Sequence, residues 1–118
     1  MIRYTLLAFI FFGSFATFAE DKFESNKASN PILIDVRTDS EWNEGYIETA
    51  IHIPLDRIME EIESLMVNKD QMIYLYCRTG NRSGEAEKAL QRLGYTNAKN
   101  IGGIIEASSS LKLKITNE

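Results

Sequence analysis

The apolar residues of this chain form short runs that alternate with amphipathic stretches. Short aliphatic runs bounded by turn-forming residues are typical of strands buried on both faces of a sheet. Such runs predict strands over residues 32–36, 50–54, 72–76 and 98–101. Because helical patterns separate these strands, the predicted fold class is α/β, with a small, mainly parallel, twisted sheet flanked by helices.

The first two predicted helices follow the first and second strands. Thr38 begins an S/T-x-x-E capping box, so we expect a short helix that starts there and ends at Gly45. Apolar residues then recur at helical spacing over roughly 55–66, which indicates an amphipathic helix facing the core. Met59 and Met66 lie within this segment, and we expect both to fill space in the core.

The last part of the chain predicts a third helix and a less regular end. We expect Ser83 to be the N-cap of a helix over 83–93, with Gly94 as its C-cap. Its predicted buried face consists of Ala86, Ala89, Leu90 and Leu93. One turn of helix should follow Gly102-Gly103. Residues 108–115 alternate weakly, which fits either an edge strand or a frayed end.

Residues 1–19 have the character of a secretory signal peptide. They carry one basic residue, Arg3, followed by an apolar run and by small residues at Thr17 and Ala19. All six phenylalanines of the chain lie at or before Phe23. The apolar run is short for a membrane span, which needs about 20 apolar residues, although an uncleaved N-terminal anchor is the alternative. The missing basic amphipathic pattern argues against a mitochondrial presequence.

Cleavage after residue 19 would leave a smaller and more acidic chain. Residues 20–118 hold 12 Lys and Arg against 17 Asp and Glu, a formal net charge of −5. We expect a periplasmic or secreted protein with a polar lead-in at 20–30, one domain at 31–107 and a polar C-terminal tail at 108–118. No basic run marks a nucleic-acid surface, and we expect no stable membrane association after cleavage.

The segment that carries chemistry follows the strand at 72–76. It begins with Cys77, the only cysteine of the chain, so no intramolecular disulfide can form. Loop N–H groups and the start of the next helix would converge on the sulfur and favour the thiolate. Arg78 and Arg82 add positive charge, and Gly80 lets the backbone turn. The segment predicts an anion cradle with a nucleophile at its base, against the alternative of a buried, inert cysteine.

With these residues the chain resembles the rhodanese family, the single-domain thiosulfate sulfurtransferases, over roughly residues 31–107. The resemblance rests on the order and spacing of several short segments. They are Asp35-Val36-Arg37, Glu41-Trp42, Gly45-Tyr46-Ile47, Ala50-Ile51-His52-Ile53-Pro54, Cys77-Arg78-Thr79-Gly80-Asn81-Arg82-Ser83, Leu93-Gly94-Tyr95 and Ile101-Gly102-Gly103. Among the departures, many members have His at Tyr46 and Gly at Thr49, where we expect altered packing rather than lost chemistry.

The resemblance implies a double-displacement reaction. Cys77 would take the outer sulfur of thiosulfate as a persulfide and release sulfite, and cyanide or a thiol acceptor would remove the sulfur. The implied donor-binding residues are Arg78, Thr79, Gly80, Asn81, Arg82 and Ser83, with Asp35 and Arg37 as structural support. Arg78 is the better candidate for the sulfonate, whereas Arg82 either shares that role or turns inward to brace the loop. No cofactor is implied, and no Cys/His cluster suggests a metal.

Three alternative functions fit the residues less well. A Cys-based phosphatase or arsenate reductase would need an arginine where Ser83 stands. A non-catalytic, partner-binding rhodanese module usually lacks the cysteine that this chain keeps. A thiol-disulfide oxidoreductase would need a Cys-x-x-Cys pair. Of the remaining candidates, we expect His52 to be structural and Trp42 to lie in the core or in a pocket wall.

Overall fold

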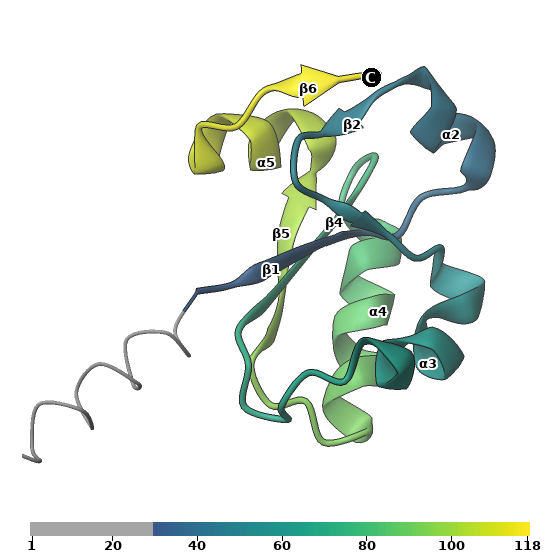
Figure 1. The fold of residues 1–118 in the computed structure, drawn as a ribbon, viewed down its shortest axis with the longest axis vertical. Coiled ribbons are helices and arrows are strands. Elements are labelled where there is room, and N and C mark those ends of the chain that lie inside the picture. The colour runs from purple at the N-terminus through teal and green to yellow at the C-terminus, as the bar shows by residue number, and fades with distance from the viewer. Residues whose placement is uncertain (1–29) are drawn as a thin grey trace, which may run out of the picture.

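A computed structural model describes residues 30–118, which form a central sheet of four parallel strands (Figure 1). The strands lie in the order β3 (Ile51–His52), β1 (Ile32–Asp35), β4 (Ile73–Cys77) and β5 (Ala98–Gly103). The predicted α/β fold with a mainly parallel sheet is therefore confirmed. The predicted signal peptide at 1–19, and all of the predicted lead-in except Asn30, lie outside the described residues.

Helices cover both faces of this sheet. Figure 1 shows α3 (Ile58–Glu61) and α4 (Asn81–Arg92) on one side and α5 (Ile104–Leu111) on the other. Side chains of β4 alternate between the faces: Leu75 and Cys77 join the core beneath α4, and Tyr76 joins a second cluster beneath α5. Burial on both faces explains why this strand reads as a continuous apolar run.

The short helix α2 (Asp39–Glu44) has the predicted capping box. The Glu41 N–H donates to Oγ1 of Thr38 at 3.3 Å, and the Thr38 N–H donates to the Glu41 carboxylate at 2.9 Å. Gly45 follows as the predicted C-cap, and its N–H donates to the Trp42 carbonyl. Because these contacts are local, the sequence pattern was sufficient to predict this helix.

The segment predicted as one amphipathic helix at 55–66 is broken into three short pieces. η1 (Leu55–Arg57) and η2 (Ile62–Leu65) are 3₁₀ helices that flank α3. Ile58 and Ile62 take the buried face, whereas Met59 is 48% exposed and Met66 is 85% exposed. The prediction that these methionines fill the core is therefore wrong. Met59 lies one position round the helix from Ile58, and Met66 ends the segment in a left-handed conformation with φ 57°.

Helix α4 begins two residues before the predicted start. Its N-cap is Gly80, which adopts φ 105°, and its first residue is Asn81. Glycine adopts this left-handed conformation without steric cost, so the chain turns from β4 into the helix within a few residues. The prediction of Ser83 as the N-cap is therefore wrong. Ser83 is fully buried in the first turn of the helix.

The C-terminal residues contribute a second, smaller sheet. Helix α5 is longer than the single turn predicted and continues through residues 108–111, where the alternation suggested a strand or a frayed end. Only the two residues of β6 (Ile115–Thr116) are extended, and they pair antiparallel with β2 (Tyr46–Ile47). Within residues 30–118, none of the helices is long and apolar enough to cross a membrane.

Candidate active site

Cys77 is the last residue of β4 and lies at the carboxyl edge of the parallel sheet. Sites in α/β folds form at this edge because the loops after the strands gather there. The side chain is fully buried, with the exposed residues Arg78 and Thr79 following it in the loop. On the other side it pairs with Gly103 of β5, where an added Cβ would clash with the Arg78 carbonyl oxygen. Glycine at 103 thus allows the close approach of β5 to the loop.

Three hydrogen-bond donors converge on the Cys77 sulfur. The Gly80 N–H lies 3.0 Å from Sγ, and the N–H and Oγ of Ser83 each lie 3.4 Å from it. Burial raises the pKa of the Cys77 thiol, but hydrogen bonds from Ser83, Gly80 and the Thr79 N–H lower it by more. The net pKa is therefore below the ordinary value for a thiol, which favours the nucleophilic thiolate.

Asn100 of β5 connects the loop to the sheet. Its Nδ2 donates to the Gly80 carbonyl at 3.1 Å. Its Oδ1 accepts from the Ser83 hydroxyl at 2.7 Å and from the Gly102 N–H at 2.9 Å. No local sequence pattern indicates Asn100, because its position at the site depends on the register that places it beside Leu75.

The two arginines of the segment have different environments. Arg82 turns toward α2 and forms a bidentate ion pair with Glu41, with distances of 2.8 and 3.1 Å. Its hydrogen bond, together with those from Thr38, lowers the pKa of Glu41 to about 2 against the opposing effect of burial. The side chain of Arg78 is 57% exposed, and its Nε lies 4.0 Å from Glu41. The sequence allows Arg82 either to bind the sulfonate or to turn inward and brace the loop, and the ion pair with Glu41 corresponds to the second role.

Asp35 and Arg37 form a buried ion pair at the end of β1. Nε and Nη2 of Arg37 donate to both carboxylate oxygens at 2.8 to 3.1 Å, and the Arg37 N–H donates to one of them at 2.9 Å. Burial lowers the pKa of Arg37, but the Asp35 carboxylate, together with Tyr76 and Glu41, raises it above its ordinary value. Nη2 also donates to the Gly45 carbonyl at 2.6 Å. The pair therefore joins the end of β1 to the end of α2.

An aromatic stack lies beside this ion pair. Trp42 is stacked between Tyr46, at 3.8 Å between ring centroids, and His52, at 4.6 Å. Nε2 of His52 lies 2.8 Å from the Arg37 carbonyl oxygen. Stacked rings and a backbone hydrogen bond account for His52 as a structural residue, as the sequence indicated. Trp42 is partly buried within the same stack.

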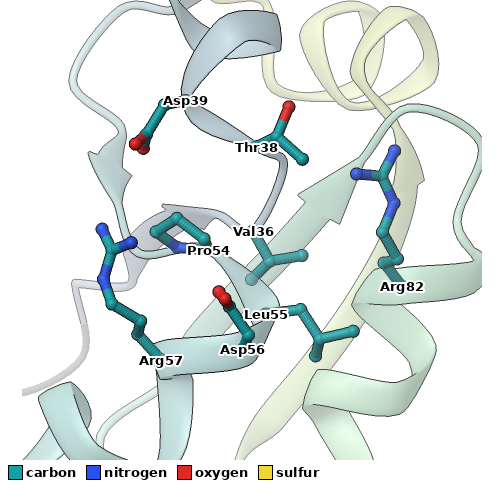
Figure 2. A pocket seen from close by; sticks show the side chains of 8 residues that line it. All are labelled: Val36, Thr38, Asp39, Pro54, Leu55, Asp56, Arg57 and Arg82. Atoms are coloured by element: carbon teal, nitrogen blue, oxygen red, sulfur yellow. The ribbon is translucent and has the colours of Figure 1, made fainter.

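A pocket of about 390 Å³ opens next to the loop. Its lining comprises Val36, Thr38, Asp39, Pro54, Leu55, Asp56, Arg57 and Arg82. Figure 2 shows Arg57 and Arg82 on opposite sides of the apolar residues Val36 and Leu55. The carboxylates of Asp39 and Asp56 and the guanidinium groups of Arg57 and Arg82 give this lining a formal charge of zero. Within residues 30–118, no group of three or more His, Cys, Asp and Glu side chains is placed to hold a metal ion.

Comparison with known protein families adds an independent observation. The model of the rhodanese-like domain matches residues 17–109 of the chain. The chain belongs to this family. The rhodanese resemblance predicted from the sequence is therefore confirmed. Thr49, where many rhodaneses have glycine, adopts φ 73° in the left-handed region, which is a physical reason for that glycine.

Individual relatives agree with this assignment. Thiosulfate sulfurtransferase PspE of Escherichia coli (strain K12) is 35% identical over 71 residues, which cover 60% of this chain and 68% of that protein. Putative sulfurtransferase YtwF of Bacillus subtilis (strain 168) is 38% identical over 82 residues, 70% of this chain and 78% of that protein. A solved rhodanese with anions from E. coli superposes with a TM-score of 0.63 at 32% identity, covering 65% of this chain and 91% of that one.

Proposed function

We propose that this rhodanese-like protein is a thiosulfate sulfurtransferase that carries the transferred sulfur on Cys77. The observation that supports it best is the convergence of the Gly80 N–H and of the N–H and hydroxyl of Ser83 on the Cys77 sulfur. These donors lower the pKa of a buried thiol, which has little other reason to ionise. The thiosulfate activity in the name of the relative PspE points to the same donor.

The reaction has two balanced half-reactions. In the first, the thiolate attacks the outer sulfur of thiosulfate, a new S–S bond forms, and the bond to the sulfonate breaks so that its electron pair leaves with sulfite. In the second, cyanide or an acceptor thiolate attacks the outer sulfur of the persulfide, and the Cys77 thiolate is the leaving group. Because the acceptor meets a covalent sulfur-enzyme intermediate, the kinetics should be ping-pong.

We assign the sulfonate of the donor to Arg78. The Arg78 side chain is more than half exposed, whereas Nη1 and Nη2 of Arg82 both donate to the Glu41 carboxylate. The neighbouring pocket does not attract a dianion by its charge, since its two arginines are balanced by Asp39 and Asp56. We also assign to the donor site the Thr79 N–H, which lowers the pKa of Cys77, and Asn81, which is exposed at the start of α4.

The donor must reach a sulfur that is fully buried. Arg78 and Thr79, the two residues that follow Cys77, are exposed, so we infer that thiosulfate approaches the sulfur from their side of the loop. Excluding bulk water from the sulfur strengthens each hydrogen bond to the thiolate. The same burial limits the access of other thiols to the persulfide.

We also infer that the protein is exported to the periplasm or secreted. This inference rests on the short basic start, apolar run and small residues within 1–19. The acidic charge of residues 20–118 gives no support to nucleic acid as a partner. N-terminal sequencing of the protein recovered from the producing cells would test it. A chain starting at Glu20 is expected, and an intact Met1 in the cytoplasm would contradict export.

The test of the proposed activity is thiocyanate formation from thiosulfate and cyanide. Wild-type protein should turn over, and Cys77→Ser should not, because serine is not ionised and forms no persulfide. The intact mass should rise by one sulfur atom after thiosulfate treatment, return after cyanide, and stay constant in Cys77→Ser. Unchanged turnover in Cys77→Ser would end the proposal. Wild-type protein that gains no sulfur would point instead to a partner-binding module.

A further inference from the structure

The Ser83 hydroxyl lies between two groups that can each accept its proton. Its Oγ is 2.7 Å from Oδ1 of Asn100 and 3.4 Å from Sγ of Cys77. A serine hydroxyl has a single proton to donate. Ser83 is fully buried, and its side chain is held in the first turn of α4. The hydroxyl can therefore donate to only one of the two acceptors at a time.

The backbone fixes the orientation of the Asn100 amide. Nδ2 faces the Gly80 carbonyl, which can only accept, and Oδ1 faces the Gly102 N–H, which can only donate. Exchanging the two amide atoms would place Oδ1 against the Gly80 carbonyl and Nδ2 against the Gly102 N–H, and neither contact would be a hydrogen bond. The amide atom that faces Ser83 is therefore the oxygen. In the 2.7 Å contact Ser83 must be the donor.

We propose that Asn100 is a positioning residue that competes with the Cys77 sulfur for the Ser83 proton, so that this hydroxyl turns with the charge on sulfur. In the neutral thiol, the Cys77 S–H donates to Ser83 Oγ, and Ser83 donates to Asn100. On ionisation the S–H bond breaks, its electron pair stays on sulfur, and its proton passes to solvent. The Ser83 hydroxyl then turns to Sγ, while Asn100 keeps the Gly102 N–H.

The reverse rotation follows sulfur transfer, a step that rests on the proposed function. When Cys77 accepts the outer sulfur, the negative charge moves to the terminal sulfur of the persulfide. Sγ is then uncharged and a weak acceptor, so the Ser83 hydroxyl returns to Asn100. Asn100 therefore opposes formation of the thiolate and favours its conversion to the persulfide. Its contact with Ser83 tunes the nucleophile without touching it.

Other titratable and charged groups lie on the elements around Cys77. Among them are Arg78 and Arg82 of the loop and α4, Glu87 of α4, Asp35 and Arg37 at the end of β1, Glu41 of α2, His52 of β3, Tyr76 of β4, Lys99 of β5 and Glu106 of α5. The Glu41 carboxylate and, less strongly, the charge on Cys77 raise the pKa of Arg82. All of them are retained when Ser83 or Asn100 is replaced. A double-mutant cycle on these two residues therefore isolates the competition from the surrounding charges.

The cycle can be read from the ultraviolet absorbance of the thiolate during a pH titration. The chain has one cysteine, so subtracting the titration of Cys77→Ser removes the tyrosine contribution. At a pH below the wild-type midpoint, Ser83→Ala should hold about fourfold less thiolate, the effect of one hydrogen bond. Asn100→Ala should hold about twofold more, because the Ser83 proton is released to sulfur. The double variant should match Ser83→Ala alone.

Two outcomes would overturn the competition. One is a decrease of thiolate in Asn100→Ala, and the other is an Asn100→Ala effect of equal size in the Ser83→Ala background. Asn97→Ala is the matched control, since this exposed asparagine in the turn before β5 donates to the Asp70 carbonyl and lies outside the site. Because the absorbance requires no sulfur donor, a protein that fails to use thiosulfate still gives a result. The proposed function and this inference therefore fail separately.

A measurement on the wild-type protein covers the case in which Asn100→Ala does not fold. The side-chain carbonyl carbon of Asn100 should change its NMR shift with pH at the midpoint of the Cys77 titration, because Oδ1 loses the Ser83 donor there. In Ser83→Ala this change should be at most about a third as large, since no hydroxyl remains to rotate. The proposal is contradicted if the Asn100 carbonyl shift does not change as Cys77 titrates, or if it changes by the same amount in wild type and Ser83→Ala.

Discussion

At the scale of single residues, the proposed reaction depends on the ionisation state of the Cys77 sulfur. Its pKa is lowered below that of an ordinary thiol by the donors of the loop, despite the opposing effect of burial. The thiolate is the reactive form, so the rate of sulfite release should rise with pH through the lowered pKa and then level off. Single-turnover measurements across pH test this. A rate that still climbs where free cysteine ionises would contradict the lowered pKa.

Arg78 is the residue on which donor binding depends in the proposed mechanism. Arg78→Ala should raise the KM for thiosulfate about tenfold, since a charge-assisted hydrogen bond of about 1.4 kcal/mol is lost. The second half-reaction with cyanide should change much less. Arg92→Ala is the matched control, because this exposed arginine lies at the far end of α4. Equal effects of the two substitutions would show that only the net charge matters.

The residues of the site differ in how far the sequence could predict them. Cys77 could be placed at the end of a strand because the apolar run before it is local. Asn100 could not, since its contacts with Gly80 and Ser83 depend on the register between β4 and β5. Ser83 was expected to cap a helix because serine often does so, but Gly80 takes that position and leaves the hydroxyl facing the sulfur.

At the scale of elements, the patterns that succeeded are the ones completed within a few residues. The capping box of α2 needs only Thr38 and Glu41, and both contacts are present. The segment 55–66 shows the limit of periodicity, since a single α-helix and the observed series of α and 3₁₀ turns both bury Ile58 and Ile62. The partner of Glu41 across the site, Arg82, is 41 residues away, and no local pattern indicates it.

The ion pair between Glu41 and Arg82 links α2 to α4, and its contribution to stability depends on pH. The folded pKa of Glu41 is about 2, below its ordinary 4.5, so the pair stabilises the folded state above pH 4.5 and is lost as pH falls toward 2. Glu41→Gln keeps an oxygen for the Thr38 cap but removes the charge. It should lower the free energy of unfolding by about 1–2 kcal/mol at neutral pH.

Urea denaturation of wild type and Glu41→Gln at several pH values measures this dependence. The difference between the two proteins should shrink as pH is lowered from 4.5 toward 2. Glu44→Gln, on the exposed side of the same helix, is the control and should change stability by at most about 0.5 kcal/mol. A difference that does not vary with pH would mean that the pair contributes through packing alone.

At the scale of the whole molecule, residues 112–116 help to cover the face of the sheet opposite α4. Leu113 packs against the cluster of Leu33, Ile47, Tyr76 and Ala107. The Glu48 N–H donates to the Lys114 carbonyl at 2.9 Å, and the two residues of β6 pair with β2. The Ile47 N–H in turn donates to the hydroxyl of Tyr76, the residue before Cys77. Residues 112–116 thus support the strand that carries Cys77.

Deletion of residues 112–118 should therefore destabilise the fold as a unit. Loss of the Leu113 contacts and of several backbone hydrogen bonds should lower the free energy of unfolding by about 2–3 kcal/mol. Deletion of 117–118 alone, beyond β6, is the control and should leave it nearly unchanged. Because Tyr76 and Cys77 share one strand, thiocyanate formation should fall with the folded fraction during urea denaturation of each protein. Stability unchanged in the longer deletion would show that β6 and Leu113 lie on the surface without holding β2 against the sheet.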